Sequence, residues 1–281
     1  MIMKSISEYI DRYTKFVDVK GVNTRFFEKG KGRPVIFLHG CTGSLESFYH
    51  NLFELSKFFR VIAIDMIGHG FTDKPNISYS PKTLADHVIN FSDTMGIDSF
   101  SLVGHAWGGW ISTLIAFFNE HRVDKVVSIC GLPPSSLAYT LNSKNKKMMD
   151  SLTIKAVTNP SLENIRERMK VMFKFYDDDV ESLALLRSKY YSLPGFSNAM
   201  RSLIENSWKG DYTLDDKLPK LSKPMMFIWG RECYFGYQQA FDAMNANQRF
   251  SLMMLSDAGE WVHWEKPEIV NAAIHFFLES G

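Results

Sequence analysis

The sequence has little cysteine, almost no excess charge and no long hydrophobic run, and each absence excludes a class of protein. Its three cysteines, Cys41, Cys130 and Cys233, lie far apart without a CxxC pair, which argues against a zinc site or disulfide framework and fits a reducing compartment. The formal net charge of +1 gives no electrostatic case for binding nucleic acid or an anionic membrane. No apolar run approaches the roughly 18 to 20 residues that a membrane span requires.

The remaining composition is typical of a globular protein. Hydrophobic residues make up 45% and charged residues 22% of the 281 positions, enough for one large domain or a domain with an insertion. The stretch from Met1 to Asp11 lacks the apolar core of a secretory signal peptide. We therefore expect a soluble, cytoplasmic protein.

Short apolar runs alternate with helical patterns along most of the chain. The predicted strands are residues 16–19, 24–27, 34–38, 61–64, 100–103, 126–130, 224–229 and 250–255. The predicted helices are residues 48–58, 81–95, 110–118 and 267–278. Continuous apolar strands that alternate with helices predict an α/β fold, with a parallel sheet covered by helices on both faces.

The pattern changes in residues 133–209, where no buried-strand run occurs. Met, Lys, Leu and aromatic residues recur there at helical spacing, interrupted at Asn159-Pro160 and Pro194-Gly195. We predict a helical cap over residues 133–209, inserted into a core formed by residues 1–132 and 210–281. Most apolar side chains of the cap are expected to pack within it, and some to line an apolar ligand cavity.

The most informative stretch is the glycine turn between the strand predicted at residues 100–103 and the helix that follows. Strand, tight turn and helix is the setting of a nucleophile elbow with the pattern Gly-x-Ser-x-Gly. Here the pattern reads Gly104-His105-Ala106-Trp107-Gly108, so the glycines are in place and a methyl group replaces the attacking hydroxyl. A covalent intermediate on residue 106 is therefore impossible.

From about Phe16 to its end, the sequence resembles the α/β-hydrolase fold family. The motifs that carry the resemblance are Leu38-His39-Gly40, residues 65–70, residues 104–109, Trp229-Gly230-Arg231 and residues 259–268. Residues 65–75 and the aromatic-rich segment after Gly259 are most similar to the meta-cleavage-product C–C bond hydrolases. The resemblance implies a mostly parallel, doubly wound sheet, with the cap insertion roofing the active site.

Carried over position by position, the resemblance implies that the whole Ser-Asp-His triad of the family is replaced. The serine position is Ala106. The acid position, two residues after Trp-Gly-Arg, is Cys233, with Glu232 beside it, and the histidine position is Glu260. Three departures at separate positions argue against a single serine-to-alanine change engineered to trap a substrate.

Other parts of a catalytic site do not need the triad. An oxyanion hole uses backbone N–H groups, and the resemblance places them at Cys41 and Trp107. Glu260 is expected beside Trp261, where partial burial would raise the carboxyl pKa and suit it to acid–base catalysis. The alternative for Glu260 is a carboxylate that pairs with a cation or faces solvent.

His105, beside the elbow residue, and His263, three residues after Glu260, are further catalytic candidates. A packing role is the alternative for both histidines. We also expect a set of residues to surround the pocket: His39, Ala106, Glu232, Cys233 and Trp261.

Three functions stay open. The favoured one is a non-hydrolytic enzyme in which Glu260, with His105 or His263, moves a proton on a small, largely apolar carbonyl compound. Isomerisation, cyclisation, a lyase step and C–C cleavage all fit that chemistry. The second is a hydrolase in which Glu260 activates water, and the third is an inactive protein that binds a small hydrophobic molecule. The sequence indicates neither a metal nor an organic cofactor, and it leaves a homodimer open.

Overall fold

The computed structural model describes the chain except for residues 1–5, 7–9, 132–143, 208–211, 235 and 281. Within this part, eight strands form one sheet in the order β1-β2-β4-β3-β5-β6-β7-β8. Their bounds are β1 (Thr14–Val19), β2 (Val22–Lys29), β3 (Pro34–Leu38), β4 (Arg60–Ile64), β5 (Phe100–His105), β6 (Val123–Ile129), β7 (Met225–Gly230) and β8 (Phe250–Leu255). The α/β-hydrolase fold expected from the sequence is therefore confirmed.

All neighbouring strands from β4 to β8 are parallel, whereas β2 pairs antiparallel with both β1 and β4. The connection between β1 and β2 contains only Lys20 and Gly21, both with positive φ (52° and 85°). Such a short connection permits only an antiparallel hairpin. Asp18 Oδ1 accepts a 2.9 Å hydrogen bond from the Gly21 N–H and secures this turn.

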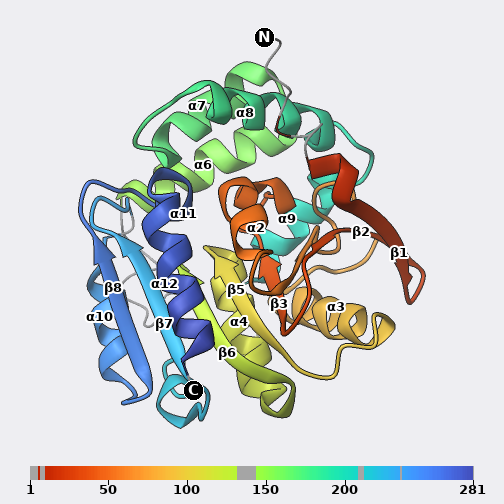
Figure 1. Ribbon diagram of the computed structural model, residues 1–281. Coiled ribbons are helices and arrows are strands. Elements are labelled where there is room, and N and C mark those ends of the chain that lie inside the picture. Colours follow the sequence, from red (N-terminus) through yellow and green to blue (C-terminus); the bar gives the residue numbers. More distant parts are fainter. Residues whose placement is uncertain (1–5, 7–9, 132–143, 208–211, 235, 281) are drawn as a thin grey trace.

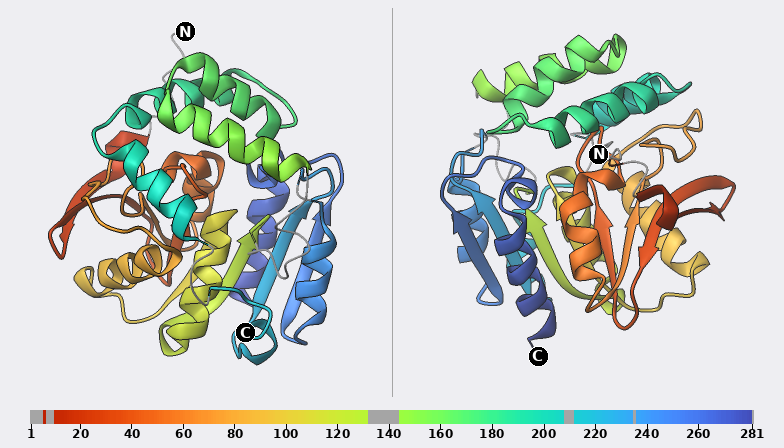
Figure 2. Two further views of the ribbon diagram at one scale, coloured as in Figure 1. Left: turned by 180° about the vertical axis from the view of Figure 1, so that it is seen from behind. Right: turned by 45° about the horizontal axis from the view of Figure 1, so that its top comes forward.

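Helices cover both faces of the sheet, as a doubly wound fold requires. Figure 1 shows α2 and α12 in front of the sheet, and the reverse view in Figure 2 shows α3, α4 and α10 on the opposite face. The bounds of these helices and of α11 are α2 (Tyr49–Leu55), α3 (Pro81–Thr94), α4 (Trp107–Phe118), α10 (Gln238–Asn245), α11 (Val262–Glu265) and α12 (Pro267–Glu279). Short 3-10 turns occupy Asp11–Tyr13, Leu45–Phe48, Glu120–Arg122 and Leu218–Lys220.

Four further helices follow β6 in the chain. They are α6 (Lys144–Thr158), α7 (Leu162–Met172), α8 (Asp178–Tyr191) and α9 (Phe196–Asn206). Three of them, α6, α7 and α8, lie above the ends of the strands at the top of the molecule in Figure 1, and α9 lies lower, at the height of α2. The break predicted at Asn159-Pro160 separates α6 from α7, and Gly195, the residue before α9, has a φ of 85°. Residues 132–143 and 208–211 are not described, so the predicted cap boundaries at 133 and 209 stay predictions.

The central strands are buried, which explains their continuous apolar sequence. All six residues of β7 are buried, as are four of the five residues of β3. None of the helices that the structure describes has the length and apolar character that crossing a bilayer demands. The buried sheet places the ends of β3, β5 and β8 under the cap, and the candidate site forms there.

Candidate active site

Ala106 occupies a sharp turn between β5 and α4. Its φ of 50° and ψ of −118° are unusual for an L-residue and cost on the order of 1–3 kcal/mol. A Cβ at Gly104 would lie 2.2 Å from the Gly108 carbonyl oxygen, and a Cβ at Gly108 would lie 1.9 Å from that of Leu38. Close backbone packing thus maintains the elbow, although its hydroxyl is missing.

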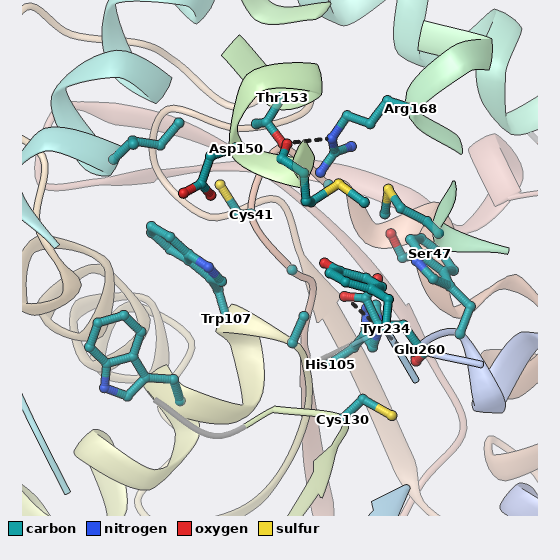
Figure 3. Close-up of a pocket in the computed structure, with 18 of the residues that line it drawn as sticks. Cys41, Ser47, His105, Trp107, Cys130, Asp150, Thr153, Arg168, Tyr234 and Glu260 are labelled. Carbon is teal, nitrogen blue, oxygen red and sulfur yellow. Dashed lines mark hydrogen bonds and ion pairs between the residues drawn. The ribbon is translucent and has the colours of Figure 1, made fainter. Parts of the chain in front are cut away.

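A cavity of about 130 Å³ lies beside Ala106, between the strand ends and the cap (Figure 3). From the core it is lined by residues that include Cys41, His105, Ala106, Trp107, Glu260 and Trp261. From the cap it is lined by residues that include Met149, Asp150, Thr153, Arg168, Met172 and Arg187. The cavity is therefore lined mostly by apolar surface, as the sequence indicated, and also by four ionisable side chains, Asp150, Arg168, Arg187 and Glu260.

Glu260 lies in the loop between β8 and α11, and its side chain is buried. Its Oε1 is 3.9 Å from Nε2 of His105, and its Oε2 has no hydrogen-bond partner among the described residues. Burial raises the pKa of this carboxyl to about 7, against the opposing effect of Arg168 and Arg187. A carboxyl with this pKa is present in both forms near neutral pH, and it can therefore accept or donate a proton.

His105 and His263 are both buried, and their rings lie 4.4 Å apart. Because carbonyl oxygens only accept, Nε2–H of His105 donates to the backbone oxygen of Glu260 (3.3 Å) and that of His263 donates to Ser47 (3.0 Å). Burial lowers the pKa of His105 well below its usual range and that of His263 to about 3. Both are thus neutral near pH 7, and His263 packs behind His105 without lining the cavity.

The two residues expected to form an oxyanion hole both line the cavity near Ala106. Trp107 is the first residue of α4, so its N–H has no acceptor within the helix. A Cβ on Gly40, which precedes Cys41, would lie 3.1 Å from the Ala106 Cβ. Burial raises the pKa of the Cys41 thiol to about 12, which argues against a thiolate nucleophile. The oxyanion role of the two amides stays a prediction.

Three residues that the sequence placed around the pocket, His39, Glu232 and Cys233, are not among the residues that line this cavity. Glu232 accepts hydrogen bonds from the N–H groups of two loop residues, 257 and 258. Cys233 is buried, and its N–H donates to Gly230 O (3.1 Å). His39 donates from Nδ1 to Gly40 O (2.8 Å) and accepts the Met66 N–H at Nε2 (3.1 Å), so it joins two loops.

Arg168 on α7 and Arg187 on α8 are charged cavity residues that the sequence reasoning missed. Both side chains line the cavity and are buried. Arg168 Nε donates to Thr153 Oγ1 (2.9 Å), as Figure 3 shows, and Arg187 lies 5.3 Å over the ring of Trp261. Arg168 follows the buried Ile165 by three residues, so helical periodicity places this charge on the apolar face of α7. This helical periodicity in the sequence could have identified Arg168 as a buried charge.

Comparisons with known proteins agree with this architecture. A family model described as alpha/beta hydrolase fold matches residues 33–267. The 2-hydroxy-6-oxo-2,4-heptadienoate hydrolase of Pseudomonas putida is 34% identical over 191 residues, which cover 66% of this chain and 64% of that protein. The dihydrolipoyllysine-residue acetyltransferase component of the acetoin cleaving system of Cupriavidus necator is 26% identical over 267 residues, which cover 92% of this chain and 67% of that protein. The chain thus spans about two thirds of the length of both relatives.

A solved structure of a meta-cleavage product hydrolase shares the fold. It is a serine-to-alanine mutant of the meta-cleavage product hydrolase from Pseudomonas fluorescens IP01, complexed with acetates. The two chains superpose with a TM-score of 0.79 at 27% identity, and the match covers 95% of this chain and 98% of that one. The likeness to meta-cleavage product hydrolases noted in the sequence is therefore confirmed.

Proposed function

Because the chain belongs to the alpha/beta hydrolase fold family and carries Ala106 at its elbow, we propose that it is an enzyme that transfers protons through Glu260. No covalent intermediate forms on residue 106, since a methyl group cannot attack a substrate. The substrate is a small carbonyl compound, and the reaction is an isomerisation, a cyclisation, a lyase step or a C–C cleavage.

The observation that carries this proposal is the state of the Glu260 carboxyl. It is buried in the wall of the cavity, Oε2 has no partner in the described residues, and its pKa is about 7. General acid–base catalysis is most effective when the pKa of the group lies near the working pH. A carboxylate placed there only for structure would be expected to have its oxygens hydrogen bonded.

The elbow supplies the second part of the mechanism. With the substrate carbonyl oxygen toward the amides of Cys41 and Trp107, negative charge that develops on that oxygen is stabilised by two N–H donors and by the start of α4. Glu260 then takes a proton from the carbon next to the carbonyl, or returns one to it. The proton and the electron pair stay within the substrate and Glu260, so no other reactant is needed.

A hydrolase in which Glu260 activates water is the second candidate. It is favoured by the printed names of the similar proteins, which include hydrolases. Water would occupy the space beside Ala106, and Glu260 in its carboxylate form would remove a proton from it. The hydrolase and the proton-transfer enzyme differ in whether solvent oxygen enters the product.

Proton exchange in deuterated water separates these functions. We expect the protein to exchange the acidic C–H of a member of a panel of small ketones and oxo acids, measured by NMR. Glu260→Gln should slow exchange by about a hundredfold to ten-thousandfold. The matched control Glu232→Gln should exchange at the normal rate, because Glu232 lies outside the cavity.

Two other results would redirect the assignment. Product that carries oxygen-18 from labelled water, without prior C–H exchange, favours the hydrolase. Saturable binding of a panel member with neither exchange nor turnover identifies an inactive binding protein, the third function considered from the sequence.

A further inference from the structure

The turn that carries the Cys41 amide has a strained backbone. The N–H of Gly43 donates to the carbonyl oxygen of Gly40 (3.0 Å) and closes the turn around Cys41 and Thr42. Thr42 has a φ of 60°, a conformation that β-branched residues rarely adopt. Such a strained residue persists only where its surroundings stabilise it. The contacts of Thr42 therefore decide whether the turn keeps its shape.

A tyrosine of the cap supplies one of these contacts. The turn follows the end of β3, and α8 lies above it at the top of the molecule (Figure 1). The hydroxyl of Tyr190 on α8 donates to the carbonyl oxygen of Thr42 (3.2 Å), and both residues are fully buried. Burial raises the pKa of Tyr190, so its hydroxyl keeps the proton that it donates. Because this carbonyl shares a planar peptide group with the Gly43 N–H, the cap fixes the peptide that closes the turn.

The core holds the residues that follow the turn. Asp65, the residue after β4, accepts the N–H of Leu45 at Oδ1 (2.8 Å). Oε1 of Glu46 lies 2.7 Å from Nη2 of Arg25 on β2, and Oε2 of Glu46 accepts the Ser44 hydroxyl (2.6 Å). All five residues are buried. These contacts fix residues 44–46 against the sheet, so the turn before them is held between the sheet and the cap.

Tyr191, the next residue of α8, lacks a comparable bond. Its ring is buried and stacks on that of Phe196 (4.5 Å between centroids), but its hydroxyl has no hydrogen-bond partner among the described residues. The ring of Tyr190 packs against the same phenylalanine (5.7 Å). The two tyrosines share a helix and a packing partner, and they differ in the bond to Thr42. Packing of the cap alone therefore does not account for the Tyr190 hydroxyl.

We propose that Tyr190 is a positioning residue, which holds the Cys41 amide in place for the substrate oxyanion and makes the oxyanion hole depend on docking of the cap. The inference rests on the proposed function, because that function uses the Cys41 N–H as an oxyanion donor. Such a donor is effective only when it lies about 2.7–3.1 Å from the developing charge. Small displacements of the amide therefore affect the rate strongly.

The relative sizes of the two effects explain why one hydroxyl matters. Removing a hydrogen bond from a buried carbonyl costs about as much free energy as the strain of a residue such as Thr42. Without the bond from Tyr190, relaxed conformations of the turn compete with the strained one. The Cys41 amide then spends part of its time away from the cavity position.

Backbone hydrogen exchange measures the turn directly. We would compare the wild type, Tyr190→Phe and the control Tyr191→Phe by mass spectrometry of peptides that cover residues 40–46. Tyr190→Phe keeps the ring and removes the bond, so exchange in these residues should be about twofold to tenfold faster. Tyr191→Phe should show the wild-type rate there. Denaturant unfolding of each variant verifies that it is folded.

A glycine at position 42 separates positioning from packing. Glycine adopts positive φ without strain, so a turn with Thr42→Gly does not need the bond from Tyr190. In this background, Tyr190→Phe should change the exchange of residues 40–46 much less than it does in the wild type. If Tyr190 served only to pack the cap, its effect would be the same in both backgrounds.

Catalysis tests whether the turn serves an oxyanion hole. For a ketone or oxo acid whose C–H exchange the wild type catalyses, Tyr190→Phe should lower kcat by about tenfold to a hundredfold. KM should change little, because the oxyanion contact forms mainly in the transition state. Tyr191→Phe should keep the wild-type kcat, and adding Thr42→Gly to Tyr190→Phe should restore most of it.

The outcomes separate the inference from the proposed function. Wild-type amide exchange in Tyr190→Phe, or an equal effect of this change with glycine at position 42, overturns the positioning of the turn. Faster amide exchange with an unchanged kcat overturns the oxyanion role. If the wild type exchanges the C–H of no panel member, the proposed enzyme and the oxyanion role fail together, and amide exchange alone decides whether Tyr190 holds the turn.

Discussion

Oε1 of Glu260 lies 3.9 Å from Nε2 of His105, and yet these two buried groups do not form an ion pair at neutral pH. Burial raises the pKa of the carboxyl and lowers that of the imidazole, so both shifts favour the neutral forms. Ionising both groups in this buried site would cost more desolvation free energy than their mutual attraction would supply. The Glu260 proton is therefore available to a ligand.

Glu260→Gln should change how stability depends on pH. The Glu260 pKa rises from 4.5 to about 7 on folding, so the folded state holds the proton more tightly. This tighter proton binding adds at most about 3 kcal/mol to the free energy of unfolding. The whole contribution is present below about pH 4.5, and it is lost as the pH rises to about 7. Denaturant titrations should thus show Glu260→Gln to be more stable than the wild type above pH 7 and less sensitive to pH between these values. Identical pH profiles for the two proteins would contradict the buried carboxyl.

Ala106→Ser alone should give little esterase activity. Serine needs a neighbouring base, and the parts of a triad act as a unit. His105 has its Nε2–H directed at the Glu260 carbonyl and a lowered pKa, and His263 lies outside the cavity. The measurements are p-nitrophenyl acetate turnover and labelling by a fluorophosphonate probe, with the unlabelled wild type as control. Strong activity in this variant would mean that His105 already activates residue 106.

His263→Gln should lower stability and leave ligand affinity unchanged. The His263 ring is buried, donates to Ser47 O and packs 5.2 Å from the ring of Phe48. Loss of such a buried hydrogen bond and of packing costs about 1–3 kcal/mol. Thermal unfolding measures the stability, and titration with a member of the ketone and oxo-acid panel that binds measures the affinity. A specific loss of turnover at full stability would return His263 to the list of catalytic groups.

Arg168→Met should be at least as stable as the wild type in the absence of ligand. The guanidinium is buried with Nη1 unpartnered among the described residues, and apolar replacement of buried charge is often neutral or stabilising. A chemical denaturation series of both proteins without ligand provides the check. A large loss of stability without ligand would indicate a structural role for Arg168.

The sequence determined the elements and their order because local patterns encode them. Residues 34–38 and 250–255 were predicted with the bounds that β3 and β8 have. Strand β3 is buried, and buried parallel strands are continuous apolar runs, whereas β8 lies at the edge of the sheet and is mostly half-buried. Helix α10 was missed because it is short and only Gln239, Ala240 and Ala243 of it are buried. The glycine spacing around Ala106 also identified the elbow, because close backbone contacts there exclude any other residue.

Only the tertiary structure decided which charged groups share the cavity. Arg168, Arg187 and Asp150 come from three cap helices, and Glu260 comes from a loop of the core. Their proximity depends on how the cap packs over the strand ends, which no local pattern specifies. The same packing turned Glu232 toward backbone amides and placed His263 behind His105. Local periodicity predicts that a side chain is buried, but contacts between segments far apart in the chain determine which other side chains it touches.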